Sequence, residues 1–256
     1  MLNVAGIAVS PHHYIDCQRV ASEMRFDLHS PIDQALLGSI SEGSPAHVDA
    51  AVTAAARAFP AWSALTAAER KPYLDRFAAE IGKRAEAFCT LESNDAGVLL
   101  SRMKHGVVPR AVLNISWFAE HALTLQDRPI ETEQATHLVR HDPAGVVAII
   151  TPWNAPLMLA TWKLGPALAA GNCVIVKPPE WAPLTSSLLA DCAHAAGLPP
   201  GVFNIVQGAG ASTGARLVSD PRLARISFTG SVPTAKWIAQ SAGANLVPCS
   251  LELGGK

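Results

Sequence analysis

Two kinds of hydrophobic spacing divide the chain. Residues about 45–124 carry apolar side chains at the repeat of amphipathic helices. Residues about 137–256 instead alternate short β-branched apolar runs with longer segments that are rich in alanine and leucine. The first part therefore predicts a helical segment, and the second predicts strands that alternate with helices.

Three helices are expected in the first part. The alanine-rich segment His47–Phe59 is followed by Pro60, which predicts that the first helix ends there. A long amphipathic helix is predicted over Ala67–Leu91. A third is predicted over Val107–Leu123, with Pro109 near its start, where a missing N–H costs little. The aromatic side chains of these helices are expected to pack in the core.

Continuous apolar runs in the second part predict buried strands: Val146–Thr151, Cys173–Lys177, Phe203–Val206, Arg225–Phe228 and Leu246–Leu251. The intervening segments predict helices: Leu157–Ala170, Leu184–Ala196, Ser212–Val218 and Thr234–Ala242. Strands that are apolar throughout and separated by helices favour a parallel sheet covered on both faces. Thr136–His141 predicts a short strand before this part. The expected fold class is α/β, a Rossmann-like parallel sheet with helices on both faces, preceded by a helical segment.

Composition excludes several classes of protein. The chain has 256 residues, of which 49% are hydrophobic, and its 20 basic and 21 acidic residues give a net charge of −1. This balance disfavours a nucleic-acid partner. No run approaches the ~20 apolar residues of a membrane span, and Val4–Val9 is too short for a secretory signal. We expect a soluble, cytoplasmic protein with neither a nucleic-acid nor a membrane partner.

The cysteines give no sign of a metal site or of disulfides. They lie far apart in the sequence, at Cys17, Cys89, Cys173, Cys192 and Cys249. No pair of them has the spacing of zinc ligands. We therefore expect no metal, and reduced thiols that pack as small core residues.

Functional side chains are expected in the loops that follow the strands, because parallel sheets bind ligands at the carboxyl ends of their strands. In Thr151–Pro156, Asn154 fits either a helix N-cap or a donor to a developing oxyanion. Lys177 emerges from a buried strand, and Glu180 has the chemistry to accept hydrogen bonds from ribose hydroxyls. Such a carboxylate would repel a 2′-phosphate, which favours NAD over NADP. A lone lysine or glutamate on a loop is usually a solvated surface residue, but the buried strand before Lys177 aims this lysine at the ligand crevice.

Two later loops contain glycines and hydroxyl groups. Gly208–Gly214 departs from the Gly-x-Gly-x-x-Gly pattern because its last glycine lies one place later, so it fits a tight turn equally well. Phe228–Ser231 ends a strand and opens a helix, where a hydroxyl caps the helix and free N–H groups bind phosphate. Taken together, the four successive loops supply what a dinucleotide needs.

Several motifs match the aldehyde dehydrogenase superfamily in order and spacing: Asp142–Val147, Pro152–Asn154, Lys177–Glu180, Phe228–Ser231 and Leu251–Lys256. The resemblance covers essentially the whole chain and implies the NAD-binding domain of that family over residues 1–256. It implies that Asn154 donates to the oxyanion of a thiohemiacetal. It also implies that Glu252 is the general base that activates water to hydrolyse the thioester.

The resemblance further implies a cofactor site. Lys177 and Glu180 would hold the adenosine ribose, and Gly210 and Gly214 would line the adenine side. Ser231 would contact the pyrophosphate region together with Trp153. The complete set implied for the cofactor is Ile150, Thr151, Pro152, Trp153, Asn154, Lys177, Glu180, Gly210, Gly214, Phe228, Thr229, Gly230, Ser231 and Leu253.

The sequence departs from the family pattern in two places. After Ser231 the family often continues with Thr-Glu and then a glycine, whereas this chain has Val232–Ala235, which permits the helix but changes its contacts with the cofactor. The family's nucleophilic cysteine would lie roughly 30–40 residues beyond Glu252. None of the five cysteines takes its place. We therefore expect a truncated chain without the catalytic domain, inactive by itself.

A finer resemblance concerns the third predicted helix. Val108–Ala111, Asn114 and Phe118–Glu120 resemble dehydrogenases of muconic-type semialdehydes, such as 5-carboxymethyl-2-hydroxymuconate semialdehyde dehydrogenase. Their substrates carry carboxylates, which Arg110 would bind bidentately; a helix-surface arginine is the other interpretation.

The expected function is NAD-dependent oxidation of an aldehyde, with a muconic-type semialdehyde as candidate substrate and a homo-oligomer typical of the family as candidate assembly. The alternative is a non-catalytic NAD-binding or oligomer-interaction remnant of the family. A relative that acylates coenzyme A is disfavoured, because Glu252 indicates hydrolysis by water.

Overall fold

The centre of the fold is a sheet whose parallel strands lie where the apolar runs predicted them. The structure, a computed structural model, describes residues 1–125 and 127–255. The parallel strands follow the spatial order β13-β12-β9-β10-β11. Their bounds are Val146–Ile150 (β9), Cys173–Lys177 (β10), Phe203–Ile205 (β11), Leu223–Gly230 (β12) and Cys249–Leu253 (β13). Every residue of β9 and β10 is buried, as strands covered on both faces require. The predicted α/β fold is confirmed.

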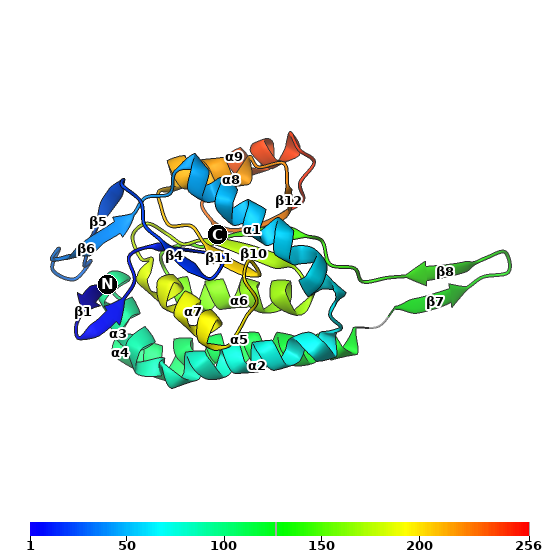
Figure 1. The fold of residues 1–256 in the computed structure, drawn as a ribbon, viewed down its shortest axis with the longest axis horizontal. Coiled ribbons are helices and arrows are strands. Elements are labelled where there is room, and N and C mark those ends of the chain that lie inside the picture. The colour runs from blue at the N-terminus through cyan, green and yellow to red at the C-terminus, as the bar shows by residue number, and fades with distance from the viewer. Residues whose placement is uncertain (126, 256) are drawn as a thin grey trace.

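Helices cover both faces of this sheet. The connecting helices are α6 (Pro156–Ala169), α7 (Leu184–Ala195), α8 (Ala215–Val218) with the π-helical turn η3 (Gly210–Gly214) before it, and α9 (Val232–Gly243). Figure 1 shows α1 (Pro45–Ala64), α8 and α9 on one face of the sheet and α6 and α7 on the other. The loops after the strands consequently meet at one edge of the sheet.

The sheet is mixed rather than entirely parallel, because an N-terminal hairpin extends it. β3 (His13–Ile15) pairs antiparallel with β11, and β4 (Gln18–Val20) pairs antiparallel with β3. The turn between them places Asp16 and Cys17 at positive φ, 54° and 61°. Such turns are usually signalled by Asn-Gly or Asp-Gly, so three-residue strands joined by Asp-Cys leave little signal in the sequence.

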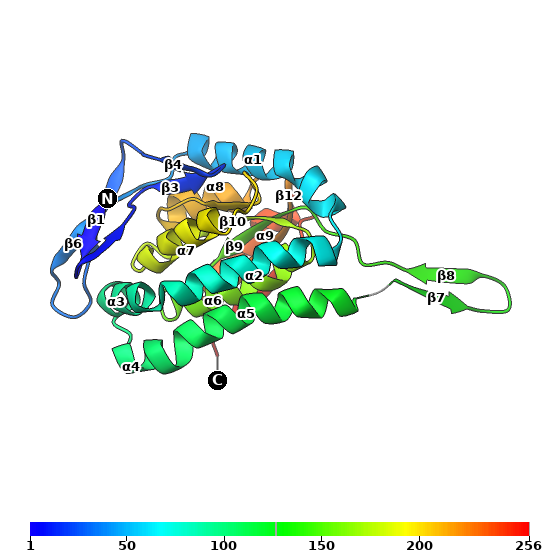
Figure 2. The same cartoon turned by 60° about the horizontal axis from the view of Figure 1, so that its bottom comes forward.

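Two further hairpins precede the helices. They are formed by β1 (Leu2–Val4) with β2 (Ile7–Val9), and by β5 (Arg25–His29) with β6 (Leu36–Ser41). A fourth hairpin, β7 (Arg128–Glu131) with β8 (Thr136–Val139), projects from the body of the molecule in both views (Figures 1 and 2). The strand predicted over 136–141 is confirmed by β8. None of the helices in the described part of the chain is both long and apolar enough to cross a membrane.

The helical part differs from the prediction at two points. α1 does not end before Pro60 but continues to Ala64, and the buried Trp62 holds its last turn in the core. The helix predicted over 67–91 is two helices, α2 (Ala67–Lys83) and α3 (Ala85–Asp95). The chain leaves helical geometry at Arg84, whose φ and ψ are −103° and 20°. The apolar repeat continues across this break, so periodicity alone did not reveal it.

The last helices of this part form an outer layer beneath α6 (Figure 2). They comprise α4 (Leu100–Arg102), a π-helical turn (Met103–Val107), α5 (Val108–His121) and a 3₁₀ turn (Ala122–Thr124). The third helix predicted, over 107–123, is confirmed by α5. A Cβ on Gly165 of α6 would lie 2.5 Å from the Asn114 carbonyl oxygen, so glycine permits the close crossing of α5 and α6.

Candidate active site

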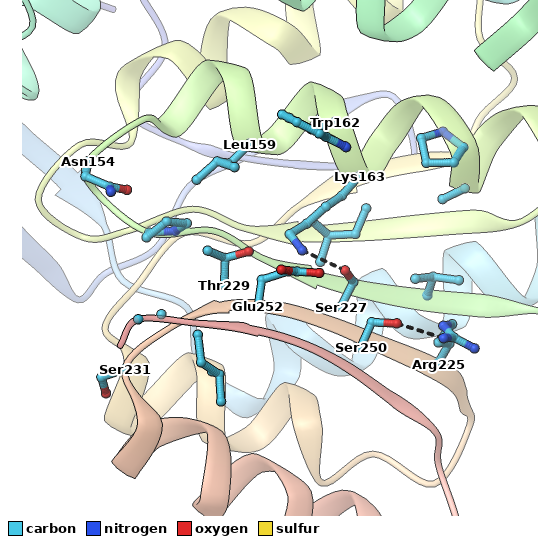
Figure 3. Close-up of a pocket in the computed structure, with 18 of the residues that line it drawn as sticks. Asn154, Leu159, Trp162, Lys163, Arg225, Ser227, Thr229, Ser231, Ser250 and Glu252 are labelled. Carbon is cyan, nitrogen blue, oxygen red and sulfur yellow. Dashed lines mark hydrogen bonds between the residues drawn. The ribbon is translucent and has the colours of Figure 1, made fainter. Parts of the chain in front are cut away.

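A cavity of about 890 Å³ opens between α6 and the face of the sheet formed by β9, β12 and β13 (Figure 3). It brings together residues that the sequence suggested from three separate loops. Those that line it are Pro152, Trp153, Asn154, Thr229, Gly230, Ser231, Glu252 and Leu253. The parallel order of β13, β12 and β9 is what places these loops side by side.

Asn154 is not a helix N-cap. The N-cap of α6 is Ala155, and no side chain caps that helix end locally. Asn154 is instead exposed in the loop before α6 and lines the cavity. Of the two interpretations of this residue, the capping one is wrong, and its side-chain amide is free to face a ligand.

Glu252 lies on β13 opposite Thr229 of β12, beside a lysine that the sequence analysis did not identify. Lys163 of α6 donates from Nζ to the Ser227 hydroxyl at 2.9 Å inside the same cavity. Burial lowers the pKa of Lys163, and the charge of Glu252 acts in the opposite direction. The available signal was a single lysine within the otherwise apolar run of α6.

Lys177 and Glu180 form an ion pair at the end of β10. Lys177 is only 3% exposed, and its Nζ donates to Glu180 Oε2 at 2.9 Å. Burial lowers the pKa of Lys177, an effect that the Glu180 charge partly offsets. Although burial raises it, the pKa of Glu180 is held below its usual value by Lys177. The solvated-loop interpretation is therefore wrong for this lysine.

The glycine segment lies next to this ion pair. Gly210–Gly214 forms the π-helical turn η3, so these glycines do more than close a tight turn. A Cβ built on Gly214 would lie 4.0 Å from Cδ of Lys177, whereas one on Gly210 would meet no atom within 4 Å. Lys177, Glu180 and Gly214 thus form one corner of the carboxyl edge, separate from the lining of the larger cavity.

The loop after β12 caps the helix that follows it, as one of its two interpretations predicted. Ser231 is the N-cap of α9, and its hydroxyl accepts from the Thr234 amide at 3.3 Å. Pro233 lies in the first turn, so the departure from the family pattern leaves the helix intact. Ser231 and Gly230 nevertheless line the cavity. Pro233 has no N–H and the Thr234 amide donates to Ser231, so Val232 supplies the amide of this first turn that no cap occupies.

Three predicted cofactor residues are buried strand ends. Ile150, Thr151 and Phe228 are 8%, 4% and 4% exposed, and they do not line the cavity. Trp153 lies between that cavity and a second one of about 570 Å³, whose walls include Glu42 and Glu180. Within residues 1–125 and 127–255, no three His, Cys, Asp or Glu side chains gather as metal ligands would. Lys256 of the last motif lies outside the described residues.

The cysteines pack in the hydrophobic core or against it. Cys89, Cys173 and Cys192 are buried in the core, as expected, whereas Cys17 and Cys249 are half-buried at its edge. Burial raises the pKa of the Cys173 and Cys192 thiols to about 12. No cysteine occurs among the described residues that line either cavity.

The Arg110 guanidinium lies over the ring of Trp162, which forms part of the wall of the larger cavity. Arg110 is exposed on α5, its Nε donates to Asn114 Oδ1 at 3.1 Å, and its guanidinium lies 5.0 Å from the centroid of Trp162. Trp162 lines the cavity. The Asn114 amide is itself fixed, because it donates to Met158 O at 3.3 Å and to Thr161 Oγ1 at 3.2 Å.

The comparison with known families agrees with this geometry. The model described as "Aldehyde dehydrogenase family" matches residues 19–256. The chain belongs to the aldehyde dehydrogenase family. Among solved structures, an indole-3-acetaldehyde dehydrogenase of P. syringae in complex with NAD+ and IAA matches it with a TM-score of 0.94 at 36% identity. That match covers 98% of this chain and 52% of the other.

Two curated relatives refine the assignment within the family. The chain is 38% identical over 254 residues to a 2-aminomuconic 6-semialdehyde dehydrogenase of a Pseudomonas species, covering 95% of this chain and 51% of the relative. It is 35% identical over 247 residues to the 5-carboxymethyl-2-hydroxymuconate semialdehyde dehydrogenase of Escherichia coli, covering 96% and 52%. The predicted resemblance to muconic-type semialdehyde dehydrogenases is confirmed. The chain spans about half the length of these relatives.

Proposed function

We propose that this chain forms the cofactor-binding part of an NAD-dependent dehydrogenase that oxidises an aldehyde to a carboxylic acid. Two observations support it most directly: Asn154 and Glu252 share one cavity, and the buried Lys177 pairs with the half-buried Glu180 at the same edge of the sheet. These are the parts needed to stabilise an oxyanion, to activate water and to hold a ribose. The NAD+ complex of the indole-3-acetaldehyde dehydrogenase supports the choice of cofactor.

The residues present fit a dinucleotide. Thr229 Oγ1 is buried without a hydrogen-bond partner although Thr229 lines the cavity, and a bound ligand would supply that partner. Lys177 and Glu180 would hold the ribose hydroxyls of the adenosine. The N-terminus of α9 at Ser231 would face the pyrophosphate. When bound, NAD accepts the hydride that leaves the substrate.

Side chains of the cavity would perform the remaining steps. The Asn154 amide would donate a hydrogen bond to the carbonyl oxygen of the substrate as negative charge develops there. The Glu252 carboxylate would take a proton from the water that releases the acid product. The ammonium of Lys163 lies beside Glu252, and the charge of that carboxylate raises the pKa of Lys163 against the effect of burial (Figure 3).

The nucleophile is proposed to come from the half of the protein that the longer relatives possess. No cysteine lines the cavities that the described residues form. Burial raises the pKa of Cys89, Cys173, Cys192 and Cys249, which keeps these thiols protonated and poorly nucleophilic.

The substrate class that we propose rests on Arg110. Asn114 accepts a hydrogen bond only from the Nε of Arg110. Within residues 1–125 and 127–255, no carboxylate pairs with the Arg110 guanidinium. Its position over Trp162, a residue of the cavity wall, supports the binding of a carboxylate on the substrate. We therefore propose a semialdehyde that carries a carboxylate, in keeping with the relatives named as muconic semialdehyde dehydrogenases.

Calorimetric titration with NAD+, combined with an NADH assay on a carboxylate-bearing semialdehyde, tests this function. We expect the chain to bind NAD+ without turning over the aldehyde. Lys177→Ala should weaken NAD+ binding at least tenfold, whereas Lys104→Ala, on an exposed turn, should not. A chain that binds no NAD+ would overturn the proposal. Turnover by this chain would contradict the origin proposed for the nucleophile.

A second candidate, a non-catalytic NAD-binding member of the family, is favoured by the absence of a cysteine from the described cavity lining. The two candidates differ in one result. If the protein that includes the remaining half also binds NAD+ but never oxidises an aldehyde, the non-catalytic function is supported instead.

A further inference from the structure

Glu42 holds the glycine segment from outside the parallel sheet. It follows β6, immediately before α1, far in the sequence from the loops discussed so far. Its carboxylate accepts from the Ala209 amide at 3.1 and 3.2 Å and from the Ser212 hydroxyl at 2.5 Å. It also lies 3.3 Å from the Thr213 hydroxyl, which donates at 2.7 Å to the Gly43 carbonyl. One side chain therefore occupies a backbone N–H and a hydroxyl of the glycine segment.

The donors that Glu42 occupies are those from which phosphate sites are usually built. Phosphate groups bind where backbone N–H groups converge at a glycine-rich turn, often with Ser or Thr hydroxyls beside them. Ala209 and Ser212 supply such groups here, but both already donate to Glu42. An added phosphate at this turn would have to displace a carboxylate.

Glu42 also changes the charge of the corner proposed for the adenosine ribose. It lines the second cavity together with Glu180 and Ala209. Its charge acts on Lys177, whose ammonium is already paired with Glu180. Two carboxylates thus face one ammonium, so negative charge is in excess at this corner.

We propose that Glu42 is a specificity-determining residue that, together with Glu180, disfavours a 2′-phosphate on the adenosine ribose. The inference rests on the proposed binding of NAD at this corner. A 2′-phosphate brings up to two negative charges at neutral pH, and like charges at close range in a partly buried site repel strongly. Glu180 would accept a hydrogen bond from the ribose 2′-hydroxyl, which a 2′-phosphate replaces. Glu42 already accepts from the groups that would donate to the phosphate, and it adds a second negative charge.

Separate titrations with NAD+ and NADP+ test this inference on the wild-type chain, Glu42→Gln, Glu180→Gln and the double variant. The glutamine at position 42 keeps an acceptor for the Ala209 amide but removes the charge. We expect the ratio of the NADP+ to the NAD+ dissociation constant to fall about fivefold or more in Glu42→Gln and further in the double variant. The control is Glu133→Gln, because that glutamate is exposed in the β7–β8 hairpin.

The ratio separates specificity from support of the fold. If Glu42 only braces the glycine segment, Glu42→Gln weakens both cofactors equally, and the inference is wrong. Glu42→Asp, which retains the charge, should retain the preference for NAD+. If Glu42→Gln does not fold, the wild-type chain alone still tests the inference. The ratio of its NADP+ to its NAD+ dissociation constant should fall as NaCl is raised, because salt screens the repulsion. A ratio that does not change with salt would overturn the inference. A wild-type chain that binds neither cofactor would overturn the proposed function itself, and this inference with it.

Discussion

Gly230 illustrates, at the scale of single residues, how a position noticed for its ligand chemistry is also fixed by packing. A Cβ at this position would lie 2.4 Å from Cζ of Phe228, a ring that is only 4% exposed. Because the ring is buried, it cannot move aside cheaply. We expect Gly230→Ala to lower the free energy of unfolding by about 1–3 kcal/mol, as measured by urea denaturation.

The control for this substitution is Gly243→Ala. Gly243 lies at the end of α9, and a Cβ there would meet no atom within 4 Å. Alanine should be neutral or slightly stabilising at that position. In a chain that carries Phe228→Leu, Gly230→Ala should lower the free energy of unfolding by less than it does in the wild-type chain. An equal decrease in both backgrounds would show that the Phe228 ring is not the cause.

Arg110 gives a second prediction at this scale. Its guanidinium is held by Asn114 and lies over Trp162. In a protein that joins this chain to the half present in the longer relatives, the proposed function predicts that Arg110→Ala raises KM for a semialdehyde with a carboxylate about tenfold or more, because a charge-assisted hydrogen bond contributes about 1.5–3 kcal/mol. KM for a neutral aldehyde of similar size should not change. Arg102→Ala, at an exposed arginine of α4, is the matched control, and equal effects on both aldehydes would contradict the assignment.

Residues were predictable from the sequence where a loop follows a strand, and missed where a contact spans distant segments. Lys177 and Glu180 stand in one motif and form the predicted neighbourhood. Lys163 lies within a helix, and only the fold shows that it faces Glu252. Glu42 lies more than a hundred residues from the glycine segment that it holds, so no local spacing could have revealed it.

At the scale of elements, α3 fixes the starts of two helices that have no side-chain caps of their own. Glu92 accepts from the Leu157 amide of α6 and from the Thr185 hydroxyl of α7, both at 3.0 Å. Asp95 accepts from the Leu184 amide of α7 at 2.9 Å. Because α6 and α7 follow the loops of Asn154 and of Glu180, these carboxylates fix where both loops end.

The burial of Glu92 predicts a specific pH dependence of stability. Desolvation raises the pKa of Glu92 from 4.5 to about 7 although Leu157 and Thr185 donate to it. A group whose pKa rises on folding stabilises the fold below its unfolded pKa, and this contribution is lost as the pH rises through its folded pKa. Relative to Glu92→Gln, the wild-type chain should therefore lose about 3 kcal/mol between pH 4.5 and pH 7.5.

Denaturation with urea across this pH range measures the difference between the two chains. The glutamine variant removes the titration of Glu92 together with its effect on the buried neighbour Asp95, whose pKa the charge of Glu92 raises, so the difference between the two chains reports on this pair. If the free energies of unfolding of the two chains changed with pH in parallel, the predicted proton linkage would be wrong. Thr66→Ala removes an exposed capping box on α2 and should cost about 1 kcal/mol equally at pH 5 and pH 7.5.

Elements were predictable wherever packing and periodicity act together. The apolar runs of β9 and β10 are buried on both faces, so composition alone identified them. The N-terminal strands are short, and β4 is stabilised by neighbours distant in sequence: Arg19 donates to the Ser187 carbonyl at 2.9 Å. Such strands depend on tertiary contacts that a local pattern does not contain.

At the scale of the whole molecule, the proposed cofactor site is assembled from loops of every strand-to-helix connection around β9, β10, β11 and β12. Binding of NAD+ should therefore stabilise the entire domain rather than one loop. At a free concentration a hundred times the dissociation constant, the gain is about 2.7 kcal/mol. For a chain of this size it should raise the thermal midpoint by about 5–10 °C.

Amide hydrogen exchange shows where that stabilisation arises. Protection should increase in residues 151–156, 208–214 and 229–234, whose N–H groups border the proposed site, and should not increase in β7–β8, which project from the body. AMP, which has the adenosine but neither the pyrophosphate bridge nor the nicotinamide, should protect 208–214 alone. If NAD+ raised the midpoint while protection appeared only on α5, the cofactor would bind elsewhere, because a ligand protects most strongly the amides that its own contacts keep closed.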